Sequence, residues 1–304
     1  MTIEHIGTVM VDLDAQLQWL WYSNASGAVI TGDENDAFKV SVANPITVSR
    51  LDRAVATKSA FNLPLPDALA REFLQQPWDG LKFLDRAAYA GVDADILRTL
   101  VFGPNYNVPM LHPPSGAIIG FRSNAMELFT REGASLKAID KTKPRGKAAL
   151  CFAAHPTEPL LVYGDNFGTF TAHRFEPTKF AKASKVAEKQ RNASGVEFLG
   201  NGVKLLIGGM GYLATLAYDG KKFSPLHEIS VPVRDVIVAR DGQTIVVNHG
   251  LHGVSVYRYD AGGFTKLAEA KPPEPVQFAV VSNDMKHLAV THQHVPKVTV
   301  YSLL

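Results

Sequence analysis

Apolar and polar positions along the chain repeat a two-strand pattern six times. Each copy has an apolar run typical of a strand, a turn of about four to six residues, and a second strand in which apolar and polar residues alternate. The six copies occupy residues 26–42, 115–131, 158–175, 203–219, 243–259 and 286–303. Self-similarity of this kind predicts one structural unit that recurs along the chain.

The spacing of the copies indicates what that unit is. Their turns begin at Gly32, Gly120, Gly164, Gly208, Asn248 and Thr291, so the first interval is 88 residues and the others are 40 to 44 residues. A short apolar run lies about ten residues before each turn, and a further strand follows most of the copies. Four antiparallel strands in roughly 40 to 45 residues are typical of a blade of a β-propeller, an all-β fold.

The two ends of the chain supply complementary pieces of this pattern. The last copy, residues 286–303, has no strand after it, whereas residues 3–11 form a strand that precedes the first copy. Pairing of this N-terminal strand with the last strand would complete a four-stranded blade, close the ring and remove an exposed edge. We therefore expect residues 1–304 to form a single β-propeller domain whose N-terminal strand closes the last blade.

The long first interval contains a different pattern. Its apolar residues recur at helical spacing, and Pro66 and Pro77 lie near the expected helix starts. We predict a helical insertion at residues 56–103, between blades one and two of a six-bladed ring. The alternative is a degenerate seventh blade in this interval. Six blades are favoured because seven would require strands where the pattern is helical.

With these features the chain resembles the WD-repeat and YVTN-type bacterial β-propellers. The resemblance rests on the four-strand repeat, the positions of the turns and the strand borrowed from the N-terminus, and it covers the chain apart from the helical insertion. No copy has the Gly-His start or the Trp-Asp end of a WD repeat, and none contains the string YVTN. Because this architecture serves scaffolds, lactonases, dehydrogenase partners and sugar binders, the resemblance implies a fold and not a chemistry.

Histidines gather in two of the turns. In propellers of this kind, the loops between second and third strands share one face with the segments that join successive blades. His249 and His252 belong to blade five, His292 and His294 to blade six, and Asp33 to blade one, so ring closure makes these blades consecutive. Imidazole with carboxylate suits zinc or another divalent first-row ion. The sequence leaves three alternatives open: a metal site of His292, His294, His249 and Asp33, a pH-sensitive ligand-binding surface of the four histidines, or solvated loops.

Basic residues concentrate in two of the joining segments. Lys141, Lys143, Arg145 and Lys147 are expected between blades two and three, where they would be solvated or would attract an acidic protein or another anionic ligand. Residues 182–191 form a second basic segment, expected between blades three and four. Trp78 marks the helical insertion, which would leave from the same face and either cover the central channel or contact a partner. Few aromatic residues accompany the lysines, so nucleic acid is a disfavoured partner.

Composition narrows the class of protein. The 304 residues are 46% apolar and 20% charged, with a net charge of +2, which fits a globular protein and argues against a surface built to coat nucleic acid or a membrane. No apolar stretch is long enough to span a bilayer, and the N-terminus lacks a signal-peptide pattern. A single cysteine, Cys151, cannot form an internal disulfide, which together with these absences leads us to expect a cytoplasmic protein. Because Cys151 lies in an apolar run, we expect its thiol to be buried and unreactive.

The sequence predicts binding more clearly than it predicts a reaction. It contains no Gly-x-Ser-x-Gly motif, and its glycine groups lack the context of a nucleotide site. The leading hypothesis is a non-catalytic propeller that engages a protein partner through its loop face and helical insertion, without a cofactor. The alternative is a metal- or ligand-dependent enzyme, such as a hydrolase or lactonase, with a histidine-rich site on that face.

Overall fold

The computed structural model describes an all-β chain. It covers residues 1–14, 16–17, 19–23, 26–33, 36–51, 109–112, 117–122, 125–132, 135–143, 149–189, 191–239, 241–282 and 284–304. The predicted helical insertion at 56–103, which includes Trp78, lies outside these residues, as do Arg145 and Lys147. Apart from strands, the described residues form two short 3₁₀ helices, Gly200–Gly202 and Gly250–His252. No helix in these ranges has the length and apolar character needed to cross a lipid bilayer.

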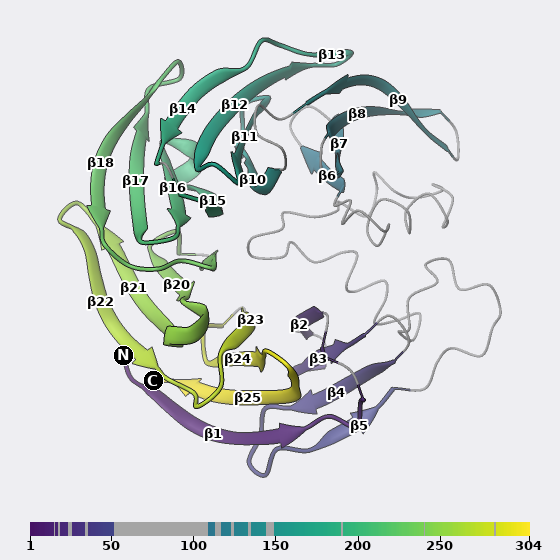
Figure 1. Cartoon of the computed structure of the whole chain (residues 1–304), viewed down its shortest axis with the longest axis vertical. Coiled ribbons are helices and arrows are strands. Elements are labelled where there is room, and N and C mark those ends of the chain that lie inside the picture. The colour runs from purple at the N-terminus through teal and green to yellow at the C-terminus, as the bar shows by residue number, and fades with distance from the viewer. Residues whose placement is uncertain are drawn as a thin grey trace. The chain divides into compact units, whose positions relative to one another are not determined.

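The described strands form six antiparallel sheets (Figure 1). Their strand orders are β2-β3-β4-β5, β6-β7-β8-β9, β10-β11-β12-β13 with β14 also on β12, β15-β16-β17-β18, β19-β20-β21-β22 and β1-β25-β24-β23. Within each sheet, strands that are consecutive in the chain are neighbours, except that β14 pairs with β12 and that β1 joins the C-terminal sheet. This arrangement confirms the four-strand repeat that the spacing of the turns predicts.

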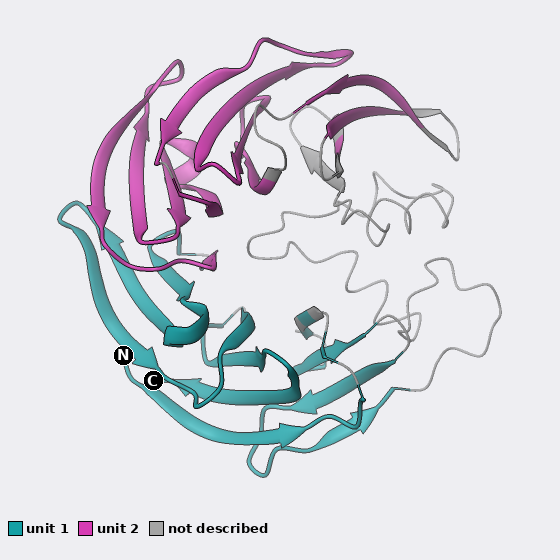
Figure 2. Cartoon of the chain, viewed as in Figure 1, with its two compact units in different colours: residues 1–73, 239–304 teal, residues 74–238 magenta. Residues whose placement is uncertain are grey.

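Two compact units contain these strands (Figure 2). Unit 1 comprises residues 1–73 and 239–304, and unit 2 comprises residues 74–238. The strands of unit 1 are β1 (Ile3–Met10), β2 (Trp19–Ser23), β3 (Ala28–Gly32), β4 (Ala37–Ser41), β5 (Val48–Arg50), β20 (Thr244–Asn248), β21 (Val254–Asp260), β22 (Gly263–Ala270), β23 (Val276–Val281), β24 (His287–His292) and β25 (Val295–Leu303).

The strands of unit 2 follow one another without interruption by those of unit 1. They are β6 (Pro109–His112), β7 (Ala117–Arg122), β8 (Ala125–Glu132), β9 (Ser135–Thr142), β10 (Ala149–Ala154), β11 (Leu160–Asp165), β12 (Thr169–Glu176), β13 (Lys179–Phe180), β14 (Ser184–Glu188), β15 (Ala193–Leu199), β16 (Lys204–Gly209), β17 (Tyr212–Tyr218), β18 (Phe223–Ile229) and β19 (Asp235–Val238).

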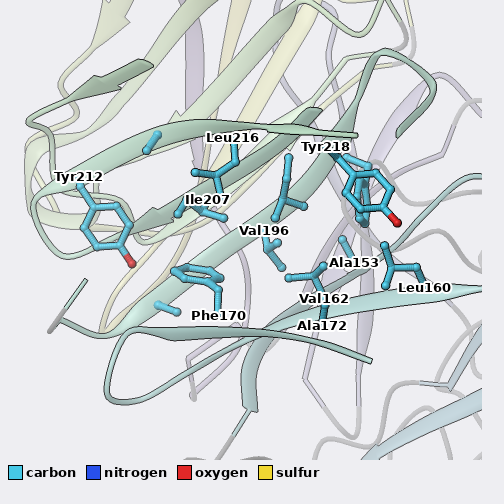
Figure 3. Packing of buried hydrophobic residues seen from close by; sticks show 14 residues of the cluster. Ala153, Leu160, Val162, Phe170, Ala172, Val196, Ile207, Tyr212, Leu216 and Tyr218 are labelled. Carbon is cyan, nitrogen blue, oxygen red and sulfur yellow. The ribbon is translucent and has the colours of Figure 1, made fainter. Parts of the chain in front are cut away.

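The core of unit 2 lies between the faces of two sheets (Figure 3). Side chains from β10–β12 and from β15–β17 form one buried cluster, in which Phe170 of the first sheet lies near Tyr212 of the second. Tyr212 and Tyr218 mark opposite ends of this cluster in Figure 3. The second strands β11 and β16 are buried along nearly their whole length. Their sequences are continuous apolar runs because neither face of the strand meets water.

The core of unit 1 is built in the same way. Val298 and Val300 of β25 and Ala289 of β24 pack with Val29 of β3 and Phe38 of β4 in a single buried cluster. The sheet that contains β1 is thereby held against the sheet β2-β3-β4-β5. In both units, burial between neighbouring sheets removes apolar surface that a lone four-stranded sheet would expose.

The N-terminal strand completes the C-terminal sheet, as the sequence predicts. β1 pairs antiparallel with β25 from Ile3 opposite Leu303 to Met10 opposite Lys297, with one irregularity between His5 and Gly7. Backbone hydrogen bonds extend the pairing past both strand ends, from Thr2 N to Leu304 O at 2.7 Å and from Val11 N to Pro296 O at 2.8 Å. The chain ends are therefore joined by a ladder that covers the edge of β25.

Removal of residues 1–11 should expose that edge. We expect the truncated protein to lose at least ~2 kcal/mol of unfolding free energy and to self-associate, because a bare strand edge pairs with other chains. Urea unfolding and analytical ultracentrifugation measure the two effects. Addition of a synthetic peptide of residues 1–11 should restore stability, and Glu4→Gln, at an exposed position of β1, is the control. Unchanged stability of the truncated protein would show that β1 is dispensable.

The outer strand of the third repeat differs from the expectation. The sequence predicts a single strand at residues 179–184, but the structure has a two-residue strand, β13, followed by β14 at Ser184–Glu188. Both strands pair with β12, and Asp140 of β9 accepts a hydrogen bond from the Phe180 backbone at 2.6 Å. Pairing with β12 orders the lysine-rich stretch, which composition alone suggests is a loop. Part of the second basic segment is therefore strand.

The side chain of His155 holds the turn between β10 and β11 in shape. Its Nδ1 accepts hydrogen bonds from the backbone N–H of Thr157, at 3.2 Å, and of Glu158, at 2.9 Å. The ring is buried and contacts Phe198 edge-on, with the ring centroids 4.9 Å apart. Gly202, whose φ is +96°, lies against the imidazole so closely that a methyl group there would overlap with Nε2. His155 thus joins the turn of one sheet to the 3₁₀ helix of the next.

A methyl group at Gly202 should break this junction. Gly202→Ala combines a backbone conformation unfavourable for alanine with a clash against His155, whereas Gly220→Ala, at a φ of +88° with open space around it, adds only the backbone cost. We expect Gly202→Ala to lower the unfolding free energy by about 1–3 kcal/mol more than Gly220→Ala. Thermal or urea unfolding measures the difference. Equal losses of unfolding free energy for the two variants would show that the contact with His155 does not contribute to stability.

Candidate functional site

The hairpin loops between second and third strands contact the segments that lead to the next sheet. We call this end of a sheet its loop end. In unit 2, Lys189 N donates to Gly168 O at 3.0 Å and Val233 N donates to Gly209 O at 2.9 Å. In unit 1, Gln293 N donates to Pro275 O at 2.9 Å. Within each unit, the two kinds of loop therefore lie together, as the expected shared face requires.

Side-chain oxygens at the ends of second strands hold these hairpins in shape. Asp33 Oδ1 accepts the Asp36 N–H at 2.7 Å, and Asn248 Oδ1 accepts the Gly250 N–H at 2.8 Å. Asp165 Oδ1 accepts two backbone N–H groups of its own loop, each at 2.9 Å. Such bonds are the usual turn chemistry of Asp and Asn. Asp33, predicted as a metal ligand, thus already orders its loop with one carboxylate oxygen.

Three hairpin loops expose a large apolar side chain at the tip, and two of them are the loops that Asp165 and Asn248 hold. Phe167 follows β11 and is 56% exposed, Met210 follows β16 and is 59% exposed, and Leu251 follows β20 and is 75% exposed. The sequence-based prediction did not include these three residues, because it was built mainly on histidine and basic residues. The available signal was an apolar residue within a Gly- or Asn-rich turn, as in DNFG, GGMG and HGLHG, where a merely solvated turn would be polar throughout.

His292 lies inside the protein and not on its surface. Its side chain is 0% exposed, and both ring nitrogens have neighbours. Nε2 lies 2.8 Å from Thr299 Oγ1, and Nδ1 lies 3.4 Å from Glu274 O and 3.8 Å from Glu274 Oε2. Glu274 also pairs with Lys297. The predicted ligand His292 is therefore enclosed by the hairpin β24–β25 and by the segment before β23.

A row of hydrogen bonds continues from His292 across the sheet to the surface. Thr299 Oγ1 of β25 lies 3.1 Å from Thr8 Oγ1 of β1, which in turn lies 3.0 Å from His5 Nε2. His5 is exposed, and its ring contacts Tyr301 edge-on with the centroids 5.7 Å apart. This row adds side-chain contacts to the backbone ladder that holds β1 in place.

Burial lowers the pKa of His292 below its ordinary value of 6.5. The positive charge of Lys297 acts in the same direction, while the Glu274 backbone carbonyl and carboxylate oppose it. The ion pair with Lys297 lowers the pKa of Glu274. His292 is consequently neutral near neutral pH, with hydrogen-bonding roles suited to a structural residue.

The other three predicted histidines do not share one environment. His249 is buried and its ring lies edge-on to Tyr257, with centroids 6.4 Å apart. His252 ends the 3₁₀ helix Gly250–His252 and is exposed. His294 is exposed at a φ of +63°, a left-handed conformation that suits the tight β24–β25 hairpin. A ligand-binding role for His252 and His294 stays a prediction, whereas His249 and His292 offer little surface to a ligand.

The described residues provide no metal-ligand set. In the ranges that the structure covers, no three His, Cys, Asp or Glu side chains gather closely enough to hold an ion. The proposed set of His292, His294, His249 and Asp33 includes two buried rings and a carboxylate that orders its turn. Nothing in this geometry draws the four side chains toward one point, which a first-row ion would require.

Cys151 in β10 also lacks the surroundings of a reactive group. Burial raises the pKa of its thiol well above the ordinary value, and the nearby carboxylates of Asp235 and Asp165 add to this effect. The thiol is therefore protonated at neutral pH, as expected for an unreactive cysteine.

The predicted basic cluster is only partly within the described residues. Lys141 lies in β9, not in the expected joining segment, and its Nζ lies 3.1 Å from Glu127 Oε1 of β8. Pairing with β8 extends β9 to Thr142 and so places Lys141 opposite Glu127. Lys143 follows the strand and is exposed. The described part of the cluster is thus one paired and one exposed lysine.

Comparison with known proteins characterises the chain by its fold. No protein family and no curated protein matches the sequence. Among solved structures, the chain is similar to a crystal structure of a protein from Lactobacillus plantarum, with a TM-score of 0.52 and 12% sequence identity. The similarity covers 62% of this chain and 65% of that one, which is less than two thirds of its length. At this identity the likeness shows a related β-rich architecture only.

The buried position of His292 predicts a pH-dependent effect of its replacement. The unfolded chain takes up a proton near pH 6.5 whereas the folded protein resists it, so the stability that this imidazole supplies is present above that pH and falls as the pH drops. We expect His292→Gln to cost about 1–3 kcal/mol of unfolding free energy at pH 8, and less at pH 5.5.

Urea unfolding of both proteins between pH 8 and pH 5.5 measures this difference, and titration of all other groups cancels in the comparison. His252→Gln, at an exposed loop position, is the control and should change stability by less than about 0.5 kcal/mol at either pH. A cost of His292→Gln that is constant with pH would contradict the proposed protonation behaviour.

Proposed function

We propose that the protein is a six-bladed β-propeller that binds a protein partner through the loop ends of its sheets. The observation that carries this proposal is the set of ordered hairpins with exposed apolar tips, Phe167, Met210 and Leu251. The helical insertion at 56–103 and the basic residues near Lys143 would add contacts to the same partner.

The propeller architecture is supported by topology. Each described sheet takes its strands in chain order, at the period expected of a blade, and the sheet with the C-terminus gains its fourth strand from the N-terminus. A ring of such blades would bury both faces of every sheet, in keeping with the buried second strands β3, β11 and β20.

Partner binding is supported by the apolar side chains of the loops, whose exposure to water is unfavourable. Phe167 and Met210 are held outward by turns whose backbone groups are hydrogen bonded, so the side chains are presented in water and cannot easily fold back. Aromatic residues and methionine are enriched in protein interfaces, and Phe167 and Met210 are of these types.

The alternative function, a metal- or ligand-dependent enzyme, has less support. His252 and His294 are exposed on loops of unit 1, but the described residues place no metal-ligand group around them. We therefore favour partner binding.

Affinity capture with variant proteins tests this function. Tagged wild-type protein, expressed in its native host, should retain a partner that Phe167→Ser/Met210→Ser loses by at least about tenfold, because two central apolar contacts would be removed. Quantitative mass spectrometry of cross-linked eluates measures the change. Val203→Ser is the matched control, since Val203 is 56% exposed but lies on the hairpin between β15 and β16, at the other end of the same sheet. Equal recovery by the double variant would contradict the proposal.

A further inference from the structure

We infer that Phe167, Arg191 and Met210 form a docking site for a partner segment in which a carboxylate side chain lies between two apolar side chains. We call these three residues the Phe-Arg-Met surface. The inference rests on the proposed binding function and specifies the chemistry of the partner. All three residues belong to unit 2.

Arg191 joins the two apolar loops. Its backbone lies against the loop of Phe167 so closely that a methyl group at Gly168 would overlap with the Arg191 carbonyl. Its guanidinium reaches the other loop, where Nη1 donates to Met210 O at 3.2 Å. The carbonyl oxygen of Asn192, which follows Arg191, accepts a hydrogen bond from Met210 N at 3.3 Å. The positive charge therefore lies between the two loops that carry Phe167 and Met210.

Arg191 differs in its pairing from the two lysines that precede it most closely. Lys185 pairs with Glu188, and Lys189 pairs with Glu228 and lies over the ring of Tyr212. Among the described residues, no carboxylate forms an ion pair with Arg191, which is exposed. A guanidinium has five N–H donors, and here one is engaged with Met210 O. No other hydrogen bond joins this guanidinium to a residue that the structure describes, so its remaining donors can bind a carboxylate with two parallel hydrogen bonds.

The flanking side chains decide between classes of partner. A nucleic acid or a polyphosphate would need several uncompensated positive charges, because binding to phosphates gains from each charge that releases counterions. This surface has one such charge between exposed Phe167 and Met210. Two apolar contacts beside one Arg–carboxylate pair suit a protein segment, in which side chains of both kinds alternate along an extended backbone.

The same arrangement explains how a single ion pair can contribute to the affinity for a partner. An exposed Arg–carboxylate pair contributes little because water and salt screen the charges. When apolar side chains of the partner cover Phe167 and Met210, water is removed around Arg191 and the pair strengthens. The apolar residues would thus supply contact area, and Arg191 would select segments that carry an acidic residue at the centre.

Selection from a random peptide library tests the inference. Peptides of twelve residues displayed on phage are selected against the purified full-length protein, and enriched sequences are synthesised with a fluorescent label. We expect a Glu or Asp between apolar residues in the enriched set. Fluorescence anisotropy should show at least a tenfold loss of affinity for Arg191→Gln and for Phe167→Ser/Met210→Ser, with no loss for Val203→Ser.

A double-mutant cycle checks the carboxylate contact without relying on the protein variant alone. Replacement of the central Glu of the peptide by Gln should weaken binding to the wild-type protein by a similar factor. The same replacement should have little effect on binding to Arg191→Gln, because the partner of the carboxylate is then already lost. Additive losses would show that the carboxylate binds elsewhere and would overturn the inference.

Two further outcomes separate this inference from the proposed function. Peptides that keep their affinity for the Phe-Arg-Met variants but lose it with Leu251→Ser would overturn the docking site and leave binding at loop ends intact. Absence of any enriched acidic peptide would also overturn the inference. In that case, loss of the captured cellular partner by Phe167→Ser/Met210→Ser would still support protein binding through another recognition chemistry.

Discussion

The structure depends on burial between neighbouring four-stranded sheets. A single sheet of this size cannot cover its own apolar face, so stability requires packing against another sheet. In unit 2, Phe170, Tyr212 and their neighbours fill the space between two sheets, and in unit 1 Phe38 and Val300 belong to a corresponding cluster. This constraint accounts for the continuous apolar second strands and for the borrowed strand β1, which gives the C-terminal sheet the same number of strands as most of its neighbours.

Because the apolar sheet faces are used for packing, the loops at the ends of the sheets are the parts that can present side chains to another molecule. Here the loops are held by short-range polar bonds, from Asp33, Asp165 and Asn248 to the backbone of their own turns. Such bonds fix the backbone without using the residue at the tip. Phe167 and Leu251 lie exposed at the tips of two hairpins that are held in this way.

Much of the fold follows from the sequence, and less of the site does. The turn spacing and strand patterns predict the sheets, and the missing strand at the C-terminus predicts the pairing of β1, because both are consequences of regular periodicity. The split of the third outer strand into β13 and β14 depends on pairing with β12 and on Asp140, neither of which leaves a pattern in the lysine-rich stretch. The histidines show the limit most clearly: His292 and His294 are two residues apart and similar in sequence context, yet one is buried and one exposed.

The hydrogen-bonded row from His292 to His5 ties together two side chains in very different surroundings. If Nδ1 of His292 carries the hydrogen and donates toward Glu274 O, then Nε2 must accept from the Thr299 hydroxyl. Thr299 in turn must accept from Thr8, and Thr8 must accept from Nε2 of His5. The hydrogen-bonding role of Nε2 in an exposed ring is then coupled to a backbone carbonyl on the far side of two strands.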